Sequence, residues 1–202
     1  PFDFRYTYYS NRQGFLRRSC YETMSHFLNK ENLGICTAKI AEKDYYQYGF
    51  ITDKMIDRNI SGQLSNSDMF IPLYLYENLN GNSKTPNFTQ EFSAFLAKHK
   101  VLKSKSPEQI LAFIYGNLYN PAYRAKYIEY LKIGFPRVDF EVTQSKFDKL
   151  AELGQNLIDL HLMKTIPQDK SIDLVFRANA NKSNPNFTLD KPKYEPNQNK
   201  II

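Results

Sequence analysis

The stretch SPEQILAFIYGNLYNPAYRAKY, residues 106–127, contains the start signals of two successive helices. Ser106 followed by Gln109 forms a capping box, and Pro107 occupies the first helical position, where its missing N–H is not needed. Apolar side chains then recur at helical spacing, at Ile110, Leu111, Phe113, Ile114 and Leu118. The first half of the stretch therefore predicts an amphipathic helix with a defined beginning.

The second half repeats the signal and extends the helical pattern downstream. Asn120-Pro121 caps a second helix, which carries Tyr123, Tyr127 and Leu131 on one face. A third helix is predicted over residues 143–162, with helical spacing of Phe147, Leu150, Leu157 and His161. These three helices form a predicted helical scaffold.

Upstream, residues 1–78 have patterns typical of short strands. Strands are predicted at residues 4–9, 34–40, 48–51 and 69–76, and a helix at 21–28. The segment 69–76 is the strongest strand, and Pro72 places it at a sheet edge or a bulge because proline cannot donate to a ladder. We therefore expect an α+β fold in which a β-rich part packs on the helical scaffold.

The remaining segments complete the predicted organisation. Residues 78–87 are predicted to be a polar loop, residues 172–176 a strand, and the tail after Ala178 irregular. The expected parts are a β-rich recognition part (1–78), a loop with a short helix (79–105), the helical scaffold (106–165), and a strand plus irregular tail of the same domain (166–202).

Composition makes a polyanionic partner worth considering without establishing one. The net charge is +6, and residues 98–149 carry ten Lys and Arg against five Asp and Glu. There is no signal peptide and no apolar run of about 18 residues, so we expect a soluble protein of the bacterial cytoplasm. Cys20 and Cys36 lack ligand spacing, which argues against a metal site. Because Pro1 stands where Met would, we expect a chain that begins inside a longer polypeptide.

No complete active site can be assembled from the sequence. Asn120-Pro121-Ala122-Tyr123 is similar to the Asn/Asp-Pro-Pro-aromatic loop of amino-methylating DNA methyltransferases, but its third residue is Ala and no Gly-rich cofactor loop precedes it. A helix cap explains it fully. His161 lies on the apolar face of its helix and is expected to be a core or interface histidine. We therefore predict no catalytic residue and no metal ligand.

Recognition is the function that the remaining polar side chains favour. Arg can read guanine and Asn or Gln can read adenine through two hydrogen bonds, whereas Lys mainly holds phosphate. Loops at about 10–18, 39–47 and 52–68 are expected to enter the major groove. The predicted DNA-binding residues are Arg12, Arg17, Arg18, Lys39, Lys43, Lys54, Arg58, Asn59 and Gln63.

Several motifs in fixed order resemble one known family. Residues 70–76 (FIPLYLY) resemble the FPLYLY segment of the C-terminal specificity region in type ISP restriction–modification enzymes. The helical stretch 106–127 and the segment 131–138 (LKIGFPRV), followed by residues 153–162, also resemble motifs of that family. So do residues 2–9 and 15–28, and the likeness extends to about residue 177. Gly134 departs from the pattern, because the family often has Asp there.

This resemblance implies a target-recognition domain that follows a nuclease, a helicase and an adenine-N6 methyltransferase in the parent polypeptide. The chain by itself would then be no enzyme. The parent would use S-adenosylmethionine, Mg²⁺ and ATP, and this segment would bind none of them. Double-stranded DNA and the methyltransferase domain of the same polypeptide are the implied partners.

Two alternatives stay open at this point. The chain could complete a methyltransferase site through Asn120 and Tyr123, in which case it would bind S-adenosylmethionine. It could also be a protein-docking module without DNA contact, whose apolar helices are the working surface. Salt-dependent binding of duplex DNA separates the recognition domain from the docking module, because phosphate contacts release counterions.

Overall fold

A computed structural model describes residues 6–12, 20–38, 49–56, 68–77 and 83–165, together with two short strands at 194–195 and 200–201. The chain divides into two compact units, residues 1–166 and 167–202. In the second unit, β6 (Tyr194–Glu195) and β7 (Lys200–Ile201) form an antiparallel pair. The predicted irregular tail is therefore wrong at these residues. The strand predicted at 172–176 lies outside the described residues.

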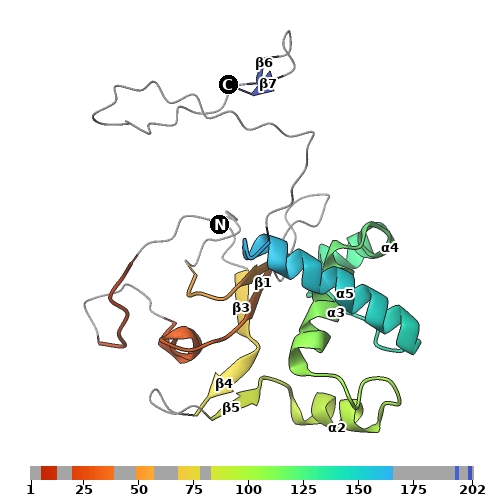
Figure 1. Ribbon diagram of the computed structural model, residues 1–202, viewed down its shortest axis with the longest axis horizontal. Helices are drawn as coiled ribbons and strands as arrows, with labels where there is room; N and C mark the ends of the chain where they lie inside the picture. Colours follow the sequence, from red (N-terminus) through yellow and green to blue (C-terminus); the bar gives the residue numbers. More distant parts are fainter. Residues whose placement is uncertain are drawn as a thin grey trace. The chain divides into compact units, whose positions relative to one another are not determined.

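The first unit contains a three-stranded antiparallel sheet (Figure 1). It consists of β1 (Gly34–Ala38), β2 (Gly49–Thr52) and β3 (Asp68–Pro72), in the order β2-β1-β3. Gly34 pairs with Thr52 on one side and with Pro72 on the other. This arrangement confirms the strands predicted at 34–40 and 48–51 over their described residues, 34–38 and 49–51. It also puts Pro72 in an edge strand of this sheet, as its missing N–H predicts.

The segment 69–76 is two strands, so the prediction of one continuous strand is wrong. After β3 the chain leaves β1, and β4 (Tyr74–Tyr76) pairs instead with β5 (Lys84–Pro86). The Leu73 N–H still donates to the Leu33 carbonyl at 2.7 Å, in the same register, but at Tyr74 the Asn32 side chain replaces the backbone partner and accepts from the Tyr74 N–H at 3.1 Å. A side chain 42 residues away in sequence thus ends the first pairing.

Two further strand predictions need correction. Residues 84–86 were expected within a polar loop, but they form β5, because Thr85 pairs with Leu75; residues 78–82 lie outside the described residues. Residues 6–9 were expected in a strand and have no regular structure. Tyr6 is fully exposed and Tyr9 stacks on Tyr21 with ring centroids 6.1 Å apart. Strand propensity alone does not supply a pairing partner.

The three helices of the predicted scaffold begin where the sequence predicts. After α1 (Tyr21–Met24) and the 3₁₀ helix η1 (Ser25–Phe27), the helical part contains four helices. Each of these four begins with a side-chain cap, and Ser106 and Gln109 form the full capping box. The four are α2 (Gln90–Lys98), α3 (Pro107–Tyr119), α4 (Pro121–Leu131) and α5 (Gln144–His161).

Helices α3 and α5 cross at very close range, and glycine makes this possible. A Cβ atom added to Gly154 would stand 1.9 Å from the Ala112 carbonyl oxygen, and one added to Gly116 would stand 2.6 Å from the Leu150 carbonyl oxygen. Either substitution would push one backbone into the other. The crossing brings Phe113 and Phe147 into a stacked contact with ring centroids 4.6 Å apart.

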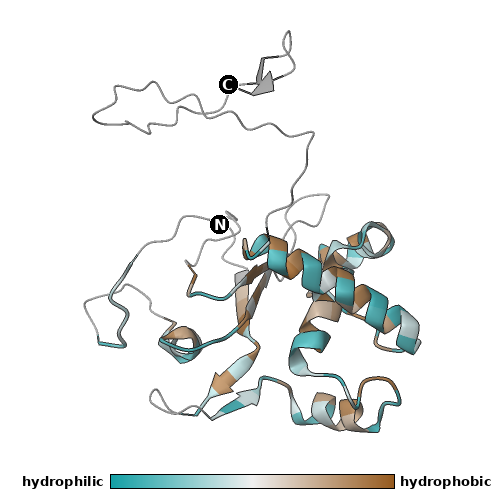
Figure 2. Cartoon of the chain, in the orientation of Figure 1, coloured by the Kyte–Doolittle hydropathy of each residue, from teal (hydrophilic) through white to brown (hydrophobic). Residues whose placement is uncertain are grey.

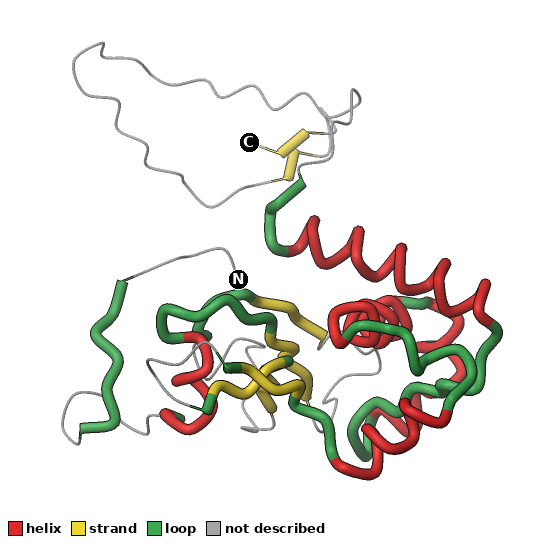
Figure 3. The backbone as a smooth tube through the Cα atoms, turned by 60° about the horizontal axis from the view of Figure 1, so that its bottom comes forward, coloured by secondary structure: helices red, strands yellow, loops and turns green. Residues whose placement is uncertain are grey.

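The sheet packs against this helix pair. Ile35 and Ile51 are paired neighbours in the sheet and share a buried cluster with Leu111, Tyr115 and Ile158. Strands lie on one side of the unit and α2–α5 on the other (Figure 3), and β1 and β3 are largely apolar (Figure 2). Within the described parts, no helix combines the length and apolar character needed to span a bilayer.

Candidate nucleic-acid interface

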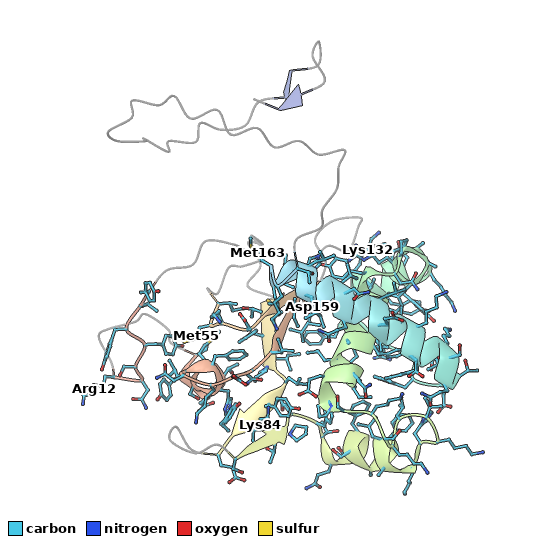
Figure 4. The ribbon with its side chains drawn as sticks, in the orientation of Figure 1. Arg12, Met55, Lys84, Lys132, Asp159 and Met163 are labelled. Atoms are coloured by element: carbon cyan, nitrogen blue, oxygen red, sulfur yellow. The ribbon has the colours of Figure 1, made fainter. Side chains whose placement is uncertain are left out.

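Two of the nine predicted DNA-binding residues fall within the described structure. Arg12 is exposed and lies on the side of the sheet away from α3 and α5 (Figure 4). Lys54 is also exposed, just after β2, and pairs with Asp53 at 3.3 Å. Outside the described residues lie Arg17, Arg18, Lys39, Lys43, Arg58, Asn59 and Gln63.

The sheet topology nevertheless fixes where the predicted loops are attached. Ala38 and Asp68 are paired, and the neighbouring Thr37 pairs with Gly49, so β1 ends where β2 and β3 begin. Residues 39–48 therefore leave and return at one end of the sheet, and the segment 57–67 leads into β3 at that same end. Lys54 follows Thr52, which pairs with Gly34 at the opposite end. The segments that contain the predicted DNA-binding residues after β1 are thus attached at both ends of the sheet, not at one end alone.

At the Lys54 end, the surface forms an open pocket of about 530 Å³ with a strongly charged lining. We call it the lysine pocket. Seven of its eleven lining residues are charged, which is unlike the mostly apolar lining of a typical small-molecule site. Four of the seven are lysines, Lys30, Lys54, Lys84 and Lys164, and three are acids, Glu31, Asp53 and Glu108.

Asn32 holds the backbone of this pocket in place. It is 7% exposed and uses its full hydrogen-bonding capacity. Its amide group donates to the carbonyls of His26 (3.1 Å) and Tyr74 (2.9 Å), and its carbonyl accepts from the N–H groups of Leu33 (2.9 Å) and Tyr74 (3.1 Å). One side chain thereby joins η1, the start of β1 and the start of β4.

Tyr74 connects the β-rich part to the helical part. Its hydroxyl donates to Glu108 at the start of α3 at 2.5 Å. Burial acts to raise the pKa of Glu108, but hydrogen bonds from Tyr74 and Ser106 and the charge of Lys84 bring it below its ordinary value. The Lys84 ammonium lies 4.1 Å from the centre of the Tyr74 ring. Glu108 is therefore an ionised carboxylate with partners of its own.

Sequence reasoning missed Lys30, Lys84 and Lys164 as candidate binding residues. Each is an isolated lysine in its own segment, and the pocket exists only because six separate stretches of the chain meet. Met163, with a φ of 57°, turns the chain after α5, and the Lys164 N–H donates to the Asp159 carbonyl at 2.8 Å (Figure 4). No pattern within any one of these segments predicts that they lie together in the fold.

The residues considered for catalysis have structural roles. Asn120 accepts a hydrogen bond from the Ala122 N–H at 2.9 Å, and Tyr123 is buried and donates to the Arg137 carbonyl at 2.8 Å. His161 is half-buried, lies 2.7 Å from the Tyr115 hydroxyl and packs against Tyr119, as expected of a core or interface histidine. Among the described residues, no group of three or more His, Cys, Asp or Glu side chains could hold a metal ion.

Fold and surface together define an α+β recognition domain, in which a helical scaffold carries a small sheet with its loops and a lysine-rich surface. The chain belongs to the family of Type ISP C-terminal specificity domains, whose family model matches residues 1–202. The α+β fold class and the resemblance of the motifs are thereby confirmed. DNA target recognition in a restriction–modification enzyme is the function of this family, as the sequence predicted.

Solved structures include similar chains. The DrdV–DNA complex, determined by cryo-electron microscopy, contains a chain with 29% identity and a TM-score of 0.53; the match covers 67% of this chain and 12% of that chain. A nuclease-deletion mutant of the Type ISP restriction–modification enzyme LlaGI, in complex with a DNA substrate mimic, has 22% identity, a TM-score of 0.48, and coverage of 68% and 11%. No curated protein matches the chain. The chain thus spans about an eighth of the length of the solved chains it matches.

Proposed function

We propose that this chain selects the DNA target of a longer restriction–modification polypeptide by reading base edges of duplex DNA with side chains of its β-rich part. The observation that carries the proposal is the sheet end at which Ala38, Gly49 and Asp68 meet, because residues 39–48 both leave and return there and the segment between β2 and β3 ends there. Those segments contain Lys39, Lys43, Arg58, Asn59 and Gln63. Arg, Asn and Gln are the side chains that make paired hydrogen bonds to guanine and adenine.

Two further observations support DNA as the ligand. The match to a chain of the DrdV–DNA complex covers two thirds of this chain. The chain also carries a net charge of +6, the sign that attracts a phosphate backbone. Arg12 is exposed and available for contact from the N-terminal segment.

We propose a different role for the helical part, which is docking on the methyltransferase domain of the same polypeptide. Several large apolar side chains on and after α4 and α5 are exposed although their helices are well packed. Ile133 is 75% exposed and Tyr130 is 69% exposed. The chain itself would make no bonds, and S-adenosylmethionine, Mg²⁺ and ATP would be bound elsewhere in the parent.

A selection experiment with the full-length protein tests the proposal. Duplexes with a randomised central region are bound, recovered and sequenced, first with the natural protein and then with residues 39–67 exchanged for those of another family member. The exchanged protein should select a different sequence. Exchange of residues 90–98, which form α2, is the matched control and should leave the selected sequence unchanged. Recovery of the original sequence after the 39–67 exchange, or of no common sequence at all, would contradict the proposal.

A further inference from the structure

The backbone of β2 meets two tyrosine hydroxyls of α3 at Gly49. Gly49 is buried and is the first residue of β2, which is an edge strand of its sheet. Its carbonyl oxygen accepts a hydrogen bond from the Tyr119 hydroxyl at 2.6 Å. The Tyr115 hydroxyl lies 3.5 Å from the same oxygen but 2.7 Å from His161 Nδ1. Tyr119 therefore makes the closer contact between the helical part and this strand end.

Groups from three helices surround the Tyr119 ring. The ring centroids of Tyr115 on α3 and His161 on α5 lie 5.0 and 5.1 Å from that of Tyr119. The Arg124 guanidinium of α4 lies 4.7 Å from the ring centre, and its Nε donates to the Leu118 carbonyl. Because packing on several sides restricts the rotamer of a side chain, the Tyr119 hydroxyl is directed at one place. The helical part thus presents a fixed donor to the Gly49 carbonyl.

Gly49 is also where residues 39–48 return to the sheet. It pairs with Thr37, one residue before the end of β1. Gln47 stands two residues before Gly49, and glutamine is a side chain that reads adenine through two hydrogen bonds. A binding group has to be held within about 0.5 Å of its productive position. A shift of the Gly49 backbone by a comparable distance would therefore affect the residues that are bonded to it.

We propose that Tyr119 is a positioning residue for target selection: its hydroxyl fixes the Gly49 backbone, and thereby the return of residues 39–48, without touching the DNA. This inference rests on the proposed function, in which residues 39–48 supply readers. It gives the helical part a share in specificity, through α3, in addition to its proposed docking role. Arg124 and His161, which pack on the Tyr119 ring, act through it.

The test compares Tyr119→Phe with Tyr123→Phe in the full-length protein. Tyr123 is the matched control, because its hydroxyl also donates to a backbone carbonyl, that of Arg137 at 2.8 Å, which lies outside the sheet. A general loss of stability would therefore affect both variants alike. Tyr119→Phe should lower the ratio of the affinities for the selected duplex and a scrambled one by about 5-fold, as expected when one hydrogen bond favours the reading arrangement. Tyr123→Phe should leave this ratio unchanged.

Hydrogen exchange of the β2 amides separates a positioning residue from a DNA contact. Without DNA, exchange in β2 should be faster in Tyr119→Phe than in the natural protein and unchanged in Tyr123→Phe, because only the first variant releases the Gly49 carbonyl.

Arg124→Lys tests whether the packing on the ring acts through Tyr119. It keeps the positive charge but removes the planar guanidinium from the ring. It should lower the ratio of affinities by a smaller factor than Tyr119→Phe does. Combined with Tyr119→Phe it should lower the ratio no further, because the hydroxyl that it orients is then already absent.

The outcomes separate the inference from the proposed function. A ratio that Tyr119→Phe leaves unchanged, or that both phenylalanine variants lower equally, overturns the positioning role and leaves the proposed function standing. A lower ratio with unchanged exchange in β2 overturns it as well, since Tyr119 would then contact the DNA itself. An equal loss of affinity for both duplexes would show that Tyr119 supports binding and not selection. If the natural protein selects no sequence, the proposed function fails and the positioning role fails with it.

Discussion

The helical part and the β-rich part are stabilised in different ways, and this difference explains which of them can carry variable loops. In α3, seven of thirteen residues are buried, and the helix crosses α5 with backbone against backbone at Gly154. The β-rich part has two small sheets, and the Asn32 side chain links the start of β1 in one to β4 in the other. The helical part therefore has a closely packed core of its own.

This arrangement suits a specificity domain. Binding residues are commonly found on loops held by a rigid scaffold, because loops tolerate changes that a core does not. Here the loops at the Ala38 end of the sheet can vary while Ile35 and Ile51 keep the sheet on α3 and α5. The comparison predicts large, global effects from changes in the helical crossing and smaller, local effects from changes in the β-rich part.

The largest effect is expected from Gly154→Ala. The new Cβ would stand 1.9 Å from the Ala112 carbonyl oxygen, so the two helices must move apart. Overpacking of this kind costs about 3 kcal/mol or more, which exceeds the roughly 1 kcal/mol that Ala gains over Gly in a helix. The measurement is the free energy of unfolding of the purified chain in urea.

Gly134→Ala is the control for this substitution, because no atom lies within 4 Å of a Cβ at Gly134. It should change the free energy of unfolding by less than about 0.5 kcal/mol. Equal losses in the two variants would show that the close crossing does not stabilise the helical part.

Asn32→Ala should have the next largest effect and act mainly on the β-rich part. It leaves two N–H groups and two carbonyls without their partner, at a cost of about 2 kcal/mol. Hydrogen exchange should accelerate at the Leu33 and Tyr74 amides more than at amides of α3. Asn156→Ala, on the exposed surface of α5, is the control and should be neutral. Uniform acceleration across α3 as well would mean that the two parts open as one.

The difference between the two parts also explains what could be predicted from sequence. The starts of α3, α4 and α5 depend on residues within one turn, such as Ser106 and Gln109, so the helices were predicted correctly. The break after Leu73 depends on the Asn32 side chain, and β5 depends on Leu75, so no local pattern could reveal them. For the same reason only Lys54 of the lysine pocket was predicted, whereas Lys30, Lys84 and Lys164 were not.

A smaller effect is expected from Ser106→Ala, which removes a local determinant of the helical part. The Ser106 hydroxyl accepts from the Gln109 N–H at 3.2 Å, and loss of such a cap costs about 1 kcal/mol. The free energy of unfolding in urea measures this loss. Ser106→Asp keeps a capping acceptor and should retain most of the stability. A loss as large as that of Gly154→Ala would indicate that the α3 start, rather than the crossing, limits the helical part.

The smallest effect is a dependence of stability on pH between about 5 and 7, to which one histidine of each part contributes. Burial lowers the pKa of His26 and of His161 below the ordinary value of about 6.5. The unfolded chain therefore binds protons at a higher pH than the folded chain does. Stability should be constant above about pH 7 and should decline as the pH falls from 6.5 through the folded-state pKa values.

The two histidines should contribute unequally to this decline. His26 Nδ1 accepts a hydrogen bond from the Tyr76 backbone N–H at 3.0 Å, and this donor has no alternative role when the ring is protonated. His161 faces the Tyr115 hydroxyl, which also lies 3.5 Å from the Gly49 carbonyl and can donate there while accepting from a protonated ring. His26→Gln should therefore reduce the change of the urea midpoint between pH 5 and 7 more than His161→Gln does. A larger effect of His161→Gln would mean that the pH dependence of stability arises mainly in the helical part. The β-rich part would then not be the more sensitive of the two to protonation.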